Sequence, residues 1–368
     1  MTVLAISSSG NAVYAANPGT AGPCTAPYAG HRIVCDPPLS NPDNGPVEAS
    51  PTVYVIFWGP DWPTPCLSPD SSEVAGQIEQ YALNLLQPIG NTGLLSWYAI
   101  LTQYGSGAPT FGGCWVDSNA PPDPVTENSA APEIEAAMAA NPTWTQTSVN
   151  SQFVIVPEQG SKVKFDTREE GKDFCAYHYW AKVGDKKKDP PLAAYDMDPV
   201  PSGKCAQFYG GPDANVPVAW QTGLSHEYTE AATDPFPKGA KVSWTDQSRK
   251  VSGEVADLCI AAGVSVGTGT YVQPLWSDKD TGVTTTLAAA ATTGDTTITT
   301  NAPLTSPMVG SPKAYISVGG TGLDWVDSTG IIVGPPDTYR SDLSKPLTAS
   351  YAAGTAVAVQ GGCVTVGS

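Results

Sequence analysis

Two short apolar runs are the most regular pattern in this chain. Thr52–Trp58 reads TVYVIFW and ends at Gly59, and residues 152–156 read QFVIV and end at Pro157. Apolar runs of this length that scarcely alternate with polar residues are typical of strands buried on both faces of a sheet. They predict two strands of a core sheet, and the apolar segment 271–276 is expected to form a third.

Helical spacing of apolar residues separates these runs. It extends over residues 72–87 and continues through an aromatic segment at 94–104. Pro132 is expected to open a short helix that ends at Ala140. A longer helix is predicted over 216–233, ended by Asp234-Pro235. The predicted fold class is therefore α+β, with a zincin-like mixed sheet backed by the last of these helices.

The composition of the chain changes near residue 282. Thr, Ala, Val and Gly dominate from 284 to 360, in short alternating segments typical of strands. We therefore expect an α+β domain over 17–282 and an all-β accessory module over 283–368. Residues 1–16 end in small residues and are read as the remnant of a secretory signal.

Eight cysteines are scattered along the chain, and no C-x-x-C pair occurs. This pattern favours disulfides over a thiolate metal site, and disulfides imply an oxidising compartment. The simplest pairing joins neighbours, although sequence does not fix connectivity: Cys24–Cys35, Cys66–Cys114, Cys175–Cys205 and Cys259–Cys363.

The net charge of −17 argues against nucleic acid and anionic membrane as partners. No apolar stretch approaches the length that spans a bilayer. The protein is expected to be secreted, extracellular and monomeric.

The chemistry of the chain is concentrated at residues 225–235, which begin Ser-His-Glu-Tyr-Thr-Glu. On a helix His226 and Glu230 lie one turn apart and project from the same face. Two metal ligands fixed by a helix, with Glu227 beside them as general base, are what a metal-activated hydrolase needs. The pattern differs from the H-E-x-x-H signature of zincins in having Glu230 as its last residue.

A second acidic pair, Glu254 and Asp257, follows 24 residues beyond Glu230. We predict that Glu254 is the third metal ligand, and that Asp257 and Asp234 lie outside the direct ligands. One imidazole and two carboxylates suit Zn²⁺ and also tolerate Mn²⁺ or Ca²⁺. Because the second carboxylate cancels metal charge, this set predicts a slow hydrolase or a structural metal.

Each of these residues also has a metal-free interpretation. Glu230 and Asp234 can cap the helix or form salt bridges, and His226 can be a hydrogen-bonded core histidine. His178 stands among aromatic residues next to Cys175. It is either a catalytic group that stabilises an oxyanion, a metal ligand, or part of an aromatic core.

Six segments of the chain together resemble the phosphate-induced, EXORDIUM-like secreted proteins of plant cell walls and bacteria. They are residues 53–59, 174–178, 204–206, 225–235, 253–259 and 272–276. Asp234 stands where plant members usually have Asn, and a second cysteine before His178 is missing. The resemblance implies an extracellular location and a role in growth or in the cell wall.

These observations lead to a secreted zincin-like metallopeptidase acting on peptides or proteins. The alternative is a non-catalytic extracellular protein that binds glycans or wall polymers and uses the metal for structure. A glycosidase is a third possibility, and it would need two of Glu227, Glu230 and Glu254 about 5–9.5 Å apart.

Overall fold

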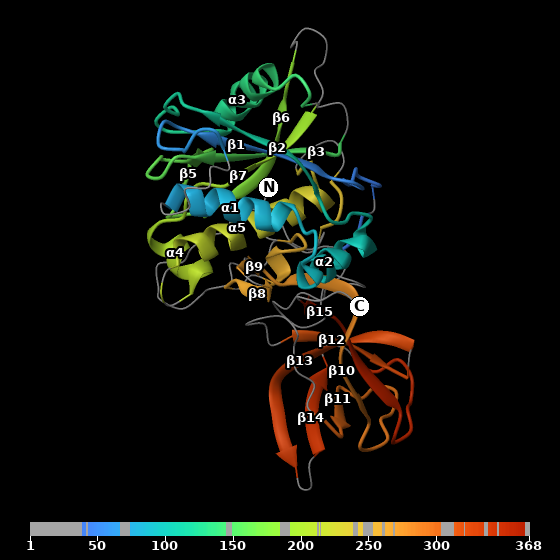
Figure 1. Cartoon of the computed structure of the whole chain (residues 1–368). Helices are drawn as coiled ribbons and strands as arrows, with labels where there is room; N and C mark the ends of the chain where they lie inside the picture. The colour runs from blue at the N-terminus through green and yellow to red at the C-terminus, as the bar shows by residue number, and fades with distance from the viewer. Residues whose placement is uncertain are drawn as a thin grey trace.

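The computed structural model shows a layered α/β body joined to an antiparallel sheet (Figure 1). The signal remnant predicted for 1–16, and Cys24 and Cys35, lie outside the described residues. The structure describes residues 39–41, 43–66, 74–144, 149–184, 192–211, 213, 215–237, 242–245, 253–259, 262–267, 269–302, 313–319, 321–334, 338–343 and 346–364.

A five-stranded, mainly parallel sheet forms the centre of the body. Its strand order is β2 (Thr110–Asp117), β1 (Thr52–Trp58), β3 (Ser151–Pro157), β7 (Leu192–Met197) and β6 (Tyr177–Lys182). The first four strands are parallel, and β6 runs antiparallel to β7 at the edge. The fold is therefore mixed α/β, and both predicted central strands lie side by side in this sheet.

The prediction that 271–276 belongs to the same sheet is wrong. Pro274 divides this segment, because proline has no N–H to donate to a strand ladder. Before it, β9 (Thr270–Val272) pairs with β8 (Val264–Gly267). After it, β10 (Leu275–Thr286) joins the C-terminal sheet.

Strand β1 is apolar throughout because both faces of the sheet are covered by helices. Val53, Val55 and Phe57 belong to one core, shared with α1 (Val74–Leu86), α2 (Thr92–Ala99) and α5 (Val216–Thr233). Tyr54, Ile56 and Trp58 belong to a second core, shared with α3 (Glu127–Ala140). In Figure 1, α3 accordingly lies on the opposite side of the sheet from α1 and α5.

Helix α3 begins earlier than the sequence predicted. A capping box between Thr126 and Ser129 starts it, and Pro132 lies inside the helix rather than at its first turn.

Helix α5 has the predicted bounds, and it is polar although all its residues from Ala219 to Thr233 are buried. The hydroxyls of Thr222, Ser225, Thr229 and Thr233 donate to backbone carbonyls three or four residues earlier. These bonds satisfy the hydroxyls locally, so the helix can be buried and the remaining polar side chains can face one another.

The C-terminal sheet is antiparallel, in the order β10, β15 (Ala356–Val364), β12 (Lys313–Val318), β13 (Thr321–Gly334), β14 (Thr338–Leu343) and β11 (Thr297–Thr300). Strand β10 crosses the domain boundary predicted at 282. It begins in the α/β body, where Tyr104 donates its hydroxyl to the carbonyl of Trp276 at 2.9 Å. The other described elements are β4 (Lys164–Phe165), β5 (Arg168–Glu169), α4 (Gly203–Gly210) and the short 3₁₀ helices η1 (Ile100–Tyr104) and η2 (Asp257–Cys259).

Disulfides join Cys66 to Cys114 and Cys175 to Cys205, and Cys259 is also disulfide-bonded. The first two pairs were predicted, and the side chain of Cys363 is outside the described part. Disulfides point to an extracellular or otherwise oxidising environment. None of the helices described combines the length and apolar character needed to cross a bilayer.

Candidate metal centre

The alternation of side chains along β6 and β7 brings His178 to the face of the sheet that α5 covers. Tyr177 and Tyr195 point into the core on the α3 side, so their neighbours His178 and Asp196 point the other way. His178 and Asp196 are directly opposite in the ladder. They lie at the carboxyl end of parallel strand β7, the end where ligands bind in open α/β sheets.

Helix α5 presents His226, Glu227 and Glu230 to this point. Glu230 lies between the two imidazoles: its Oε1 is 3.2 Å from His226 Nε2, and its Oε2 is 3.4 Å from His178 Nδ1. Glu227 also faces both rings, with Oε2 3.4 Å from His178 Nδ1 and Oε1 3.9 Å from His226 Nε2. Helix α5 therefore places the carboxylates of Glu227 and Glu230 against His178, which belongs to β6.

The turn at 253–259 supplies the remaining carboxylates. Glu254 Oε1 lies 3.3 Å from His178 Nε2, and Asp257 Oδ1 lies 3.8 Å from His226 Nε2. The turn is held by the Leu258 N–H bond to the Glu254 carbonyl and by the Glu254 N–H bond to Asp257 Oδ2. The Asp257 N–H donates to Glu230 Oε1 at 3.0 Å and fixes the turn against α5.

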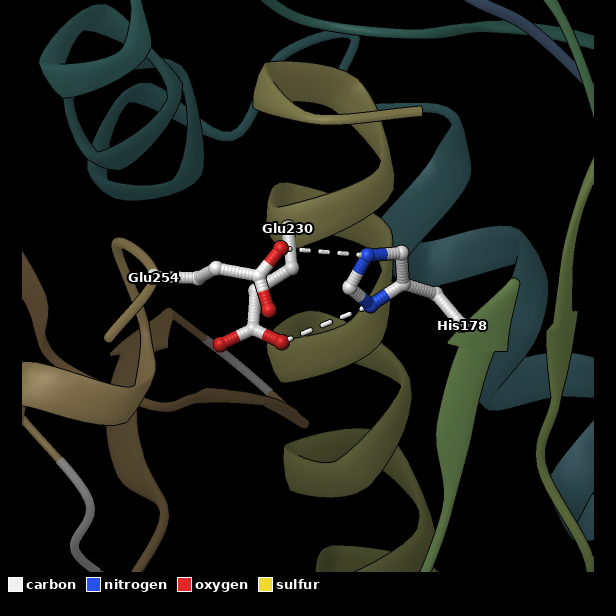
Figure 2. Close-up of side chains that lie close together, drawn as sticks. All are labelled: His178, Glu230 and Glu254. Atoms are coloured by element: carbon white, nitrogen blue, oxygen red, sulfur yellow. Dashed lines mark ion pairs between the residues drawn. The ribbon is translucent and has the colours of Figure 1, made fainter. Parts of the chain in front are cut away.

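The donor atoms form two groups, each with one histidine and two carboxylates. His178, Glu230 and Glu254 form the first (Figure 2), and His226, Glu230 and Asp257 form the second. Within each group one donor atom from each residue lies within 4.8 Å of the others. The predicted ligands His226, Glu230 and Glu254 therefore do not form one group. Glu254 joins His178 instead, and Asp257, which was predicted to lie outside the direct ligands, joins His226.

Gln273 holds the other side of the His226 ring. Its Nε2 donates to the Ala256 carbonyl at 2.7 Å, so its Oε1 faces His226 Nδ1 at 3.0 Å and accepts the ring proton. In the neutral ring this leaves the lone pair on Nε2, the nitrogen that faces the carboxylates. Sequence reasoning gave Gln273 no role, and its only signal was its place in the Val-Gln-Pro segment.

Several donor atoms at this centre are buried without a hydrogen bond. Both ring nitrogens of His178, Nε2 of His226, Oε2 of Glu230 and Oδ1 of Asp257 have no hydrogen-bond partner among the described residues. Their contacts with one another are ion pairs only when the histidines are protonated. With neutral rings such atoms cost free energy unless something binds them. A divalent cation can bind one nitrogen of a ring together with carboxylate oxygens, and imidazole and carboxylate donors suit Zn²⁺, Mn²⁺ and related ions. The residues therefore fit a metal ion, whose type they do not identify.

The electrostatics of the group are dominated by its carboxylates. Burial alone would lower the pKa of His178 and of His226, but Glu254 beside the first ring and Glu230 beside the second raise both pKa values well above the ordinary one. Burial would raise the pKa of Glu230, but the two histidines hold it below its usual value. Burial raises the pKa of Glu227, and His226 offsets this in part. In the metal-free protein, the protonated His178 and His226 thus balance part of the negative charge of the carboxylates.

Three further buried acids near this group were not predicted as site residues from the sequence. Burial raises the pKa values of Glu48, Asp196 and Asp198 well above the ordinary ones. Asp196 accepts a hydrogen bond of 2.6 Å from Gln152. The available signal was Asp-Met-Asp at 196–198, two acids on one face of an otherwise apolar strand.

Asp234 belongs to neither donor group. Its Oδ1 accepts the Ser243 N–H at 3.0 Å, so it anchors the segment that follows α5. Burial and, after it, repulsion by Glu254 raise the pKa of Asp234 from 3.8 to about 7.

Comparison with known proteins adds nothing to this geometry: no protein-family model, curated protein or solved structure matches the chain. The resemblance to EXORDIUM-like proteins stays a prediction.

Proposed function

We propose that the protein is a secreted metal-dependent hydrolase, and that its active site is the centre formed by α5, β6 and the 253–259 turn. The observation that carries the proposal is the set of buried imidazole and carboxylate atoms that face one another and converge in two donor groups. A divalent metal ion held by these residues would polarise a carbonyl group and lower the pKa of a coordinated water.

Glu227 is the proposed general base. It belongs to neither donor group, yet its carboxylate lies between the two imidazoles. Burial raises its pKa, which brings a carboxylate closer to the range where it can take a proton from water and return it. His226 is oriented by Gln273, and His178 supplies the opposite wall of the site.

A peptide is the proposed substrate class. His178 lies on β6, the edge strand of the main sheet, and edge strands can bind an extended peptide as an additional strand. The resemblance to EXORDIUM-like proteins favours a cell-wall setting, where such a peptidase would meet extracellular protein.

A second candidate function is supported by the burial of the site. The side chains of His178, Glu227 and Glu254 are 0%, 2% and 6% exposed. A metal ion enclosed to this degree is typical of structural sites, in which protein atoms fill every position. The protein would then be a non-catalytic extracellular binding protein for glycans or wall polymers.

Glu227→Gln separates the two functions because it preserves volume and leaves both donor groups intact. The metallated wild type and Glu227→Gln would be assayed with casein and a broad peptide library, together with metal content and Tm. A hydrolase loses activity in the variant and keeps its metal and its Tm. Glu133→Gln, on the other face of the sheet, is the matched control and should keep full activity. A metallated wild type that cleaves nothing would reject the peptidase and leave the structural metal. An equally active Glu227→Gln would instead reject Glu227 as the general base.

A further inference from the structure

We propose that this centre binds two divalent cations, bridged by the carboxylate of Glu230. The inference rests on the proposed function only in that both require metal at this site. One cation would be held by His178, Glu230 and Glu254, and the other by His226, Glu230 and Asp257.

The division of the donors supports two positions. Each donor group has a histidine and a carboxylate of its own, and only Glu230 belongs to both. The two oxygens of Glu230 are directed apart, Oε2 to His178 at 3.4 Å and Oε1 to His226 at 3.2 Å. Three protein donors are sufficient for a metal ion that retains an open position, so neither group needs the residues of the other.

The backbone holds the two groups as separate units. Asp257 is fixed beside His226 because its N–H donates to Glu230 Oε1 and its Oδ2 accepts the N–H of Glu254. Gln273 fixes the His226 ring from behind. Glu254 is the member of the same turn that faces His178 instead, at 3.3 Å from Nε2. The turn therefore delivers one carboxylate to each imidazole.

The charge of the centre also favours two cations. Glu227, Glu230, Glu254 and Asp257 carry four negative charges when ionised, and the histidines are neutral when they bind metal. For Glu227, Glu230 and Asp257, histidines are the only cationic partners within the described ranges. Two divalent ions would match the charge of four ionised carboxylates, whereas one ion matches the charge of only two.

The chemistry of the donors defines the class of ion. Carboxylate oxygens with one imidazole per position suit Zn²⁺, Mn²⁺ and similar divalent ions. Paired ions in hydrolases lie about 3.5–4 Å apart and act together on the attacking and leaving oxygens.

The test is metal stoichiometry, which does not depend on activity. The full chain would be stripped with a chelator, reloaded with Zn²⁺ or Mn²⁺, and measured by native mass spectrometry and elemental analysis. We expect two ions per chain in the wild type, one in Asp257→Asn, one in Glu254→Gln, and fewer than one in Glu230→Gln. Glu133→Gln, a buried carboxylate outside the centre, should keep two.

The Mn²⁺ form of the wild type gives a second measurement that needs no variant. Two bridged Mn²⁺ ions produce a spin-coupled electron paramagnetic resonance spectrum, whereas a single ion produces an uncoupled six-line spectrum. One ion per chain with the uncoupled spectrum would overturn the paired centre and leave the proposed hydrolase intact. No bound ion would overturn both.

Discussion

His226 Nδ1 and Gln273 Oε1 lie 3.0 Å apart and fix the tautomer of the histidine that faces the carboxylates. The glutamine cannot turn its amide around without losing the bond from its Nε2 to the Ala256 carbonyl. When the ring is neutral its proton therefore stays on Nδ1, and Nε2 can bind a cation.

Replacement of this glutamine should weaken metal binding without removing a ligand. We expect Gln273→Leu to lower the affinity for Zn²⁺ by about 10- to 100-fold, the usual effect of losing a group that orients a ligand. Competition with a chromophoric chelator measures this. Gln221→Leu is the matched control. Gln221 is a buried glutamine like Gln273, but it lies on α5 and bonds to the backbone of Tyr81 and Tyr271. Equal losses in the two variants would show that Gln273 contributes only to packing.

Removal of the metal should destabilise the protein. Without a cation the carboxylates of Glu227, Glu230 and Asp257 are buried with histidines as their only cationic partners in the structure as described. A ligand present at 100 times its Kd stabilises the folded state by about 2.7 kcal/mol. We therefore expect EDTA to lower Tm in a thermal scan, and Zn²⁺ to restore it. Glu230→Gln should have the low Tm already and respond little to EDTA; an identical response in wild type and variant would contradict the prediction.

The sequence predicted those parts of the site that depend on local geometry. His226, Glu227 and Glu230 lie together because they share one helix, and a one-turn spacing is visible in any sequence. The central strands were predictable for a similar reason, since burial on both faces leaves an unbroken apolar run.

The division of the ligands was not predictable, because it depends on contacts between distant segments. Glu254 lies beside His178 only because β6 adds antiparallel to the edge of the sheet, and the sequence predicts neither the strand order nor its direction. Gln273 reaches His226 from the short connection between β9 and β10, where the chain passes from one sheet to another. Asp196 lies opposite His178 because of the register of β6 with β7.

Glu133 should make stability depend on pH. Burial, and after it repulsion by Asp117, raises the pKa of Glu133 from 4.5 to about 8. The folded state therefore holds this proton between pH 4.5 and about 8, where the unfolded chain has lost it. The contribution of Glu133 is present below pH 4.5 and is lost as pH rises through about 8, by at most about 1.4 kcal/mol per pH unit.

Glu133→Gln cannot lose a proton, so its free energy of unfolding should rise relative to the wild type as pH increases from 5 to 8. Urea denaturation of both proteins at three pH values in this range measures the difference. Asp117→Asn should make the total change between pH 5 and 8 smaller, since without the repulsion the pKa of Glu133 is lower. A difference between Glu133→Gln and wild type that stays constant with pH would contradict the assignment.

The disulfide between Cys175 and Cys205 should matter for metal binding as well as for stability. It connects α4 to the segment that enters β6, three residues before His178, and it packs with Ala219 of α5. Its loss should cost about 3.5 kcal/mol of stability from the chain entropy of a loop of this length. We also expect about a tenfold loss of Zn²⁺ affinity, because His178 is no longer held against α5.

The Cys66–Cys114 disulfide provides the comparison. Its sequence separation of 48 predicts a loss of about 4 kcal/mol, similar to that of the first bond, but neither cysteine lies near a donor residue in sequence. The two double alanine variants should thus unfold at similar urea concentrations while only Cys175→Ala/Cys205→Ala binds Zn²⁺ more weakly. Equal Zn²⁺ affinities in both variants would mean that packing of β6 against β7 is sufficient to position His178.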